Sequence, residues 1–141
     1  MSESSAIVAP VIALVCWHHL MWLWMYATRI PAIQGAGMKM DPTRPAGEQM
    51  AMLPPSVRWK ADNYNHLFEA PVLFYAVALS LAVLGAGSGW NVTLAWAYVL
   101  LRVIHSVFQS TVNKIEVRFG IFVLSSLVLF ALTFNAARLV F

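Results

Sequence analysis

Charged residues are scarce in this sequence. Lys, Arg, Asp and Glu make up 11% of the 141 residues, whereas an ordinary soluble domain carries about 25%. Hydrophobic residues make up 60%, and the mean hydropathy is +0.70. This composition excludes a typical soluble domain and indicates an integral membrane protein of one domain. The formal net charge is only +3 and the basic residues are scattered, so nucleic acid is not an expected partner.

Cysteine and histidine are also rare. The single cysteine, Cys16, excludes an internal disulfide, and its apolar surroundings favour a buried, unreactive thiol. Among the four histidines, His18 and His19 are adjacent and point to different faces of a helix, so no metal site is expected. Residues 1–5 lack the basic segment of a cleavable signal peptide, and the first apolar stretch is therefore expected to remain as a membrane span.

Long apolar stretches predict an all-α integral membrane protein, a bundle of four transmembrane helices. The expected spans are about 6–29, 57–84, 90–112 and 117–139. Arg29 and Pro31 are expected to end the first span, and Pro71 to kink the second without ending it. The stretch 34–56 is rich in Gly and Pro and is expected to form a long loop.

Basic residues gather at two of the three connecting loops. The first loop and its borders carry Arg29, Lys39, Arg44, Arg58 and Lys60. The third loop region carries Lys114 and Arg118, whereas the second loop carries no Lys or Arg. The positive-inside rule therefore places loops one and three in the cytoplasm and both termini outside.

Polar residues inside the second and third spans mark a candidate site. Four of them recur at i, i+4, i+7 and i+11, and would share one stripe of a continuous helix: Arg58, Asp62, Asn65 and Glu69. Three more lie on one face of the third span: Arg102, His105 and Gln109. Because an arginine at membrane depth needs a partner, Glu69 is expected to pair with Arg102.

Together these residues predict one basic, hydrogen-bonding chamber in the cytoplasmic half of the bundle. Its expected members are Arg58, Lys60, Asn65, Glu69, Arg102, His105, Gln109, Lys114 and Arg118. The cations suit the carboxylates of a small ligand such as a tripeptide, and Glu69 suits its ammonium group. Other interpretations stay open. Glu69 and Arg102 could form a structural ion pair, Arg118 could be a surface arginine that only follows the positive-inside rule, and His105 could serve in helix packing.

The sequence resembles a known membrane family in two segments. The segment 65–74, Asn-His-Leu-Phe-Glu-Ala-Pro-Val-Leu-Phe, resembles the second-helix signature of the MAPEG family. These are the membrane-associated proteins of eicosanoid and glutathione metabolism, such as microsomal glutathione transferases and microsomal prostaglandin E synthase. The segment 102–105, Arg-Val-Ile-His, followed by Arg118, resembles the third and fourth helices of the same family. The resemblance covers essentially the whole chain.

The resemblance implies a homotrimer of four-helix bundles in membrane lipid, in the inner membrane for a bacterial-type member. Glutathione would lie between neighbouring subunits as co-substrate. The resemblance assigns ligand binding to Arg29, Asn65, Glu69, Arg102 and His105. It assigns catalysis to Arg118, which would lower the pKa of the glutathione thiol and so supply a thiolate nucleophile. Arg58, Gln109 and Lys114 are further expected binding residues, from the chamber itself.

This chain departs from the family pattern at several positions. Asn65 and Glu69 are separated by three residues where the family has two. Gln109 stands where a tyrosine is usual, and Phe119 or Phe122 where the family has a serine or tyrosine near the thiol.

The pattern is compatible with functions of different classes. The first is a glutathione-dependent transferase or peroxidase acting on lipophilic electrophiles from the bilayer. The alternative is a non-catalytic trimeric membrane protein that binds a lipid head group, with its phosphate on Arg102, or serves as an accessory subunit. A transporter is a weaker third option, because four unbroken spans offer little machinery for alternating access.

Overall fold

The computed structural model describes residues 5–141. The expectation about a signal peptide concerns residues 1–4 in large part, and these lie outside the described residues. The described chain is helical throughout, without a strand. Its elements are α1 (Val8–Gly35), the 3-10 turn η2 (Met50–Met52), α2 (Pro55–His66), α3 (Ala70–Val83), α4 (Trp90–Thr111) and α5 (Ile115–Val140). Four segments are long and apolar enough to cross a membrane, and α2 with α3 forms one of them. The predicted all-α, four-span fold is confirmed.

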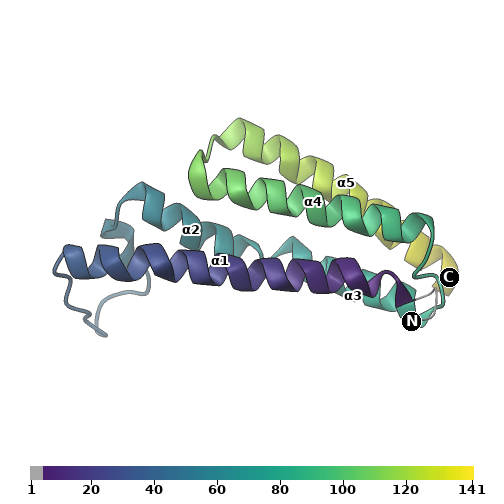
Figure 1. The fold of residues 1–141 in the computed structure, drawn as a ribbon, viewed down its shortest axis with the longest axis horizontal. Coiled ribbons are helices and arrows are strands. Elements are labelled where there is room, and N and C mark those ends of the chain that lie inside the picture. Colours follow the sequence, from purple (N-terminus) through teal and green to yellow (C-terminus); the bar gives the residue numbers. More distant parts are fainter. Residues whose placement is uncertain (1–4) are drawn as a thin grey trace.

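The helices run along one another in a long bundle (Figure 1). α1 lies beside α2 and α3, and α5 packs along α4. The loop 36–54 and the α4–α5 turn lie at one end, and the two termini lie at the other end with the α3–α4 turn (Figure 1). Loops one and three therefore share an end, as their common positive charge requires. The cytoplasmic location of that end stays a prediction.

Helix α1 continues through Pro31 to Gly35, so the expectation that it ends at Arg29 and Pro31 was wrong. Proline lacks one amide hydrogen and fixes φ near the helical value, so a membrane helix can include it at the cost of one hydrogen bond. The helix stops where Gly37 takes a positive φ of 60° and donates its N–H to the Gln34 carbonyl. A glycine in this conformation carries no steric penalty and commonly ends a helix.

The second span is broken into two helices rather than kinked at Pro71. α2 ends at His66, and Glu69 lies outside the helical region with φ −89° and ψ −101°. Pro71 sits in the first turn of α3, where its missing N–H leaves no intrahelical bond unmade. The Leu67 carbonyl, freed by the break, accepts a hydrogen bond from His18 Nε2 of α1 at 2.8 Å. A side chain from a neighbouring helix thus satisfies the backbone at membrane depth.

The bond from His18 to the helix break gives a stability prediction. Replacing His18 by phenylalanine keeps an aromatic ring but leaves the buried Leu67 carbonyl without its donor, so we expect a loss of about 1–3 kcal/mol. His19→Phe is the matched control, because His19 is exposed and should change stability by less than about 0.5 kcal/mol. Thermal unfolding in one detergent, followed by circular dichroism, compares them. Equal losses for both variants would contradict the role of His18.

The two ends of the bundle interior differ in polarity. An apolar core fills the end near the termini, where Phe74 stacks on Tyr98 with ring centroids 4.5 Å apart. The interior towards loops one and three is polar, and Asn63 Nδ2 donates to Ser106 Oγ at 2.7 Å there. The buried polar side chains of this half are Asn63, Arg102, His105, Ser106, Gln109 and Ser110. The fold therefore directs the polar face of α4 towards α2.

Candidate functional site

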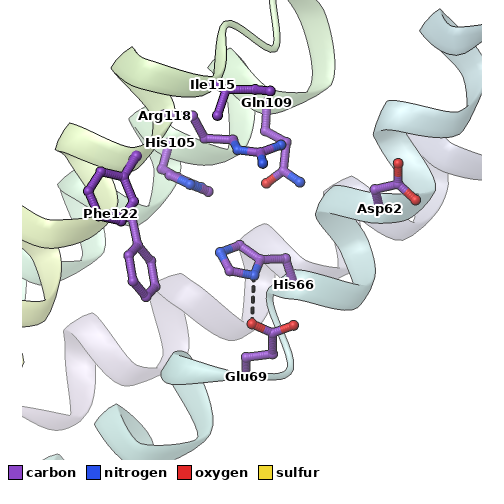
Figure 2. A pocket seen from close by; sticks show the side chains of 9 residues that line it. Asp62, His66, Glu69, His105, Gln109, Ile115, Arg118 and Phe122 are labelled. Atoms are coloured by element: carbon purple, nitrogen blue, oxygen red, sulfur yellow. Dashed lines mark hydrogen bonds and ion pairs between the residues drawn. The ribbon is translucent and has the colours of Figure 1, made fainter.

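A pocket of about 500 Å³ lies between α2, the α2–α3 break, α4 and α5 (Figure 2). It is lined by Asp62, His66, Glu69, His105, Gln109, Ile115, Arg118, Phe119 and Phe122. Four residues that the sequence singled out meet here, namely Glu69, His105, Gln109 and Arg118. The pocket thus combines a carboxylate, imidazoles and a guanidinium with an aromatic wall from α5. We call it the first pocket.

Glu69 is paired with His66, three residues earlier in the chain. Its Oε2 lies 2.8 Å from Nδ1 of His66 (Figure 2). The His66 ring in turn packs on the His105 ring, with centroids 5.1 Å apart. The expected ion pair of Glu69 with Arg102 was wrong: within residues 5–141 the Glu69 carboxylate contacts His66 and forms no ion pair with Arg102. The broken helix explains this, because it turns Glu69 back over the last turn of α2.

The turn between α4 and α5 positions Arg118. Asn113 has a positive φ of 51°, and its N–H donates to the Phe108 carbonyl at 2.9 Å, which ends α4. Asparagine is one of the few residues besides glycine that adopt this conformation readily. Its side-chain oxygen accepts a hydrogen bond from Arg118 Nη1 at 2.7 Å. One residue therefore both ends a helix and holds the guanidinium at the first pocket.

Arg102 lies outside this pocket, one helical turn from His105. It is fully buried, and its three guanidinium nitrogens have no hydrogen-bond partner within the described chain. The Tyr98 hydroxyl, the Asn63 side-chain oxygen and His105 Nδ1 are also buried without a partner in residues 5–141. α4 therefore carries a buried polar stripe that leads from the first pocket into the bundle. Arg102 lines neither this pocket nor the second pocket described below, so its role in ligand binding stays a prediction.

A second pocket, of about 330 Å³, lies on the other side of α2. It is lined by Arg29, Gly47, Met50, Ala51, Arg58, Ala61, Asp62 and Asn65. Arg29, Arg58 and Asn65 therefore gather here, and only Asp62 lines both pockets. Within the single chain, residues expected in one chamber therefore line two pockets, because the break after His66 removes Glu69 from the stripe.

The two expected lysines lie outside both pockets. Lys60 places its ammonium group 5.0 Å from the centre of the Trp24 ring and donates to the Ser56 carbonyl at 2.8 Å. Lys114 is exposed and directly precedes α5. Neither pocket therefore receives a lysine, and arginine supplies their positive charge.

Sequence reasoning missed His66 and Ile115 as pocket residues, and placed Asp62 on the polar stripe without giving it a binding role. A usable signal existed for His66, because residues three apart on a helix are neighbours and can pair. The stripe of Asn65 and Glu69 does not include His66, because position 66 points about 100° away from Asn65 on an unbroken helix. Ile115 carries no distinguishing signal, since an isoleucine at the start of a membrane helix is unremarkable in this composition.

Comparison with known proteins identifies the family. The MAPEG family model matches residues 7–138, nearly the whole chain. No curated protein and no solved structure matches it. The match agrees with the four apolar helices and with the motifs at 65–74 and 102–118. The chain is an integral membrane protein and belongs to the MAPEG family, whose members are generally associated with the use of glutathione.

Proposed function

We propose that this protein is a membrane-bound, glutathione-dependent transferase or peroxidase that acts on lipophilic electrophiles. One observation carries the proposal: the first pocket joins the Arg118 guanidinium to an aromatic wall formed by Phe119 and Phe122. A thiolate needs a cation beside it, and a lipophilic acceptor needs apolar surface next to that thiolate. The pocket offers both within one space of about 500 Å³.

The remaining groups of the first pocket suit the other parts of glutathione. Glu69 uses only Oε2 for His66, so Oε1 is free to accept a hydrogen bond from the ammonium group. Gln109 offers an amide for the peptide backbone of the ligand. Arg118, held by Asn113, lies beside the sulfur and stabilises its negative charge. The thiolate then attacks an electrophile that enters past Phe119 from the lipid.

We further propose a homotrimer in which neighbouring subunits complete the site. Asp62, Asn65 and Glu69 are exposed on the single chain although they belong to the span Pro55–Val83. Polar groups of this kind are too costly to face lipid, so protein or a wet cavity must cover them. In the trimer the second pocket of one subunit faces the first pocket of the next, and Arg29 and Arg58 bind the glutathione carboxylates across the interface.

The first test is binding. Isothermal titration of the detergent-solubilised oligomer with glutathione should give saturable binding, and light scattering should give the mass of three chains. Absence of binding in an intact trimer would reject the proposal.

The second test separates sites within one subunit from sites between subunits. Arg29→Ala and Arg118→Ala subunits are each expected to be inactive as homotrimers. Mixed trimers of the two should regain conjugation activity, because some interfaces then combine Arg29 of one subunit with Arg118 of its neighbour. If mixed trimers stay inactive, both arginines act within one subunit.

The structure does not favour the non-catalytic alternative, in which the protein binds a lipid head group. A lipid phosphate on Arg102 would have supported it, but Arg102 is fully buried and lines neither pocket. A head group could reach Arg118 only in the first pocket, where it would compete with glutathione. Inhibition of conjugation by an anionic phospholipid would reveal such competition.

Asn113 gives a prediction that separates its two roles. Asn113→Gly keeps the positive φ without strain but removes the acceptor for Arg118, so conjugation should fall about tenfold at unchanged stability. Asn113→Ala should lower activity similarly, and should also lose about 1 kcal/mol of stability because alanine disfavours this conformation. Initial rates and thermal unfolding measure the two effects. Wild-type activity in both variants would show that Arg118 does not need this tether.

A further inference from the structure

A histidine–carboxylate pair occupies the first pocket, and the proposed function leaves its histidine, His66, without a chemical role. His66 Nδ1 lies 2.8 Å from Glu69 Oε2, and the side chain of His66 is only 23% exposed. A carboxylate oxygen accepts hydrogen bonds, so in the neutral ring the proton sits on Nδ1. The lone pair is then on Nε2. Within the described residues Nε2 takes no hydrogen bond, and His66 lines the pocket.

We propose that His66 is the general base that removes the proton from the glutathione thiol, and that Glu69 is the positioning residue that fixes its tautomer. This inference rests on the proposed function and deepens it. Figure 2 shows the His66 ring between Glu69 on one side and His105 with Arg118 on the other. A base oriented by a third group beside a cation is the arrangement that activates weak nucleophiles in many enzymes.

His105 does not serve this role. Its side chain is 1% exposed, and its Nδ1 is buried without a partner in the described chain, so no carboxylate fixes its tautomer. It instead forms the surface on which the His66 ring packs, at 5.1 Å between centroids. The Phe122 ring of α5 also packs on the His66 ring, with centroids 5.7 Å apart. His66 is therefore held on two sides and by its hydrogen bond.

The charged and titratable groups around His66 come from each packed element. Asp62 and Glu69 belong to α2 and the break that follows it, His105 to α4, and Arg118 to α5. Arg102 of α4 lies deeper in the bundle, beyond His105. The pocket thus holds two carboxylates and a guanidinium around the imidazole pair.

The proposed step balances as follows. The S–H bond breaks, the proton moves to Nε2 of His66, and the electron pair stays on sulfur next to Arg118. The thiolate forms a C–S bond with the electrophile, and the displaced electron pair ends on its leaving group or oxygen. An oxygen takes the proton from Nε2, whereas a halide leaves as the anion and Nε2 then gives its proton to water. Both routes restore the neutral histidine. No oxidant or reductant is needed for conjugation.

The rate of thiolate formation tests the assignment on the intact oligomer. The protein is mixed rapidly with glutathione at about pH 8, and the thiolate is followed by its ultraviolet absorbance. With His66 as base, the thiolate should form about 100-fold faster in the wild type than in His66→Gln. If Arg118 acts alone, both proteins form the thiolate at the same rate. Equal rates in the two folded proteins would overturn the proposal.

Variants provide the second readout. His66→Gln should lower the conjugation rate at saturating glutathione about 100-fold while glutathione still binds. Glu69→Gln in that background should weaken glutathione binding but lower the saturated rate little further. His19→Gln, an exposed histidine outside the first pocket, is the control and should keep the wild-type rate. Wild-type turnover in folded His66→Gln would overturn the base and leave the proposed function intact. Failure of the wild type to bind glutathione would overturn both.

Discussion

Replacing Arg118 by alanine is expected to lower kcat/KM for thiol conjugation about 1,000-fold, the largest catalytic loss in this chain. The guanidinium is the cation of the first pocket, and Asn113 holds it at 2.7 Å from one nitrogen. Removing one fixed donor from a developing anion commonly costs 100- to 1,000-fold, and a full charge lies at the upper end. Most of the loss should fall on kcat, because the thiolate is stabilised more than the bound thiol.

The measurement is the initial rate of conjugation with a chromogenic aryl halide in detergent micelles. Arg138→Ala is the matched control: Arg138 lies on the same helix, at its far end, over the Phe134 ring at 5.8 Å. It should keep the wild-type rate. A small, equal decrease for both arginines would show that Arg118 merely follows the positive-inside rule, which the sequence left open.

The four-span fold was predictable because lipid imposes a simple demand. A helix that crosses the hydrocarbon must be long and apolar, and the runs that became α4 and α5 begin and end within two residues of the expected ranges. The break in the second span was not predictable in this way. It depends on His18, whose bond to Leu67 joins residues 49 positions apart. Local patterns carry no information about such a partner.

The composition of the site was predictable in part for the same reason. Helical spacing placed His105 and Gln109 on one face of α4, and both line the first pocket. The stripe on the second span assumed an unbroken helix, so it grouped Glu69 with Asn65. In the structure Glu69 lies beyond the end of α2, and these two residues line different pockets. Pro71 is compatible with a kink inside a membrane helix and with the first turn of a new helix, so the proline alone does not locate the break.

Arg102 matches the family motif, but the contact predicted for it with Glu69 was wrong. The arginine lies where the family resemblance expects it, and the cost of burying it made Glu69 the natural partner. The structure gives Glu69 to His66 instead, and leaves Arg102 fully buried without a partner in the described chain. A buried guanidinium without a counter-charge should weaken the fold rather than support it.

Arg102→Met is therefore expected to stabilise the protein, by about 2 kcal/mol. Methionine has an unbranched side chain of similar length that fills the same space, and it removes the desolvation cost of the charge. Urea or thermal unfolding of the detergent-solubilised protein measures the change, with Arg44→Met in the exposed first loop as the control that should alter stability by less than about 0.5 kcal/mol. A loss of several kcal/mol in Arg102→Met would mean that the charge has a compensating partner in the assembled protein. In that case the buried stripe from Tyr98 to Gln109 would be a polar network completed on assembly, and Arg102 its centre.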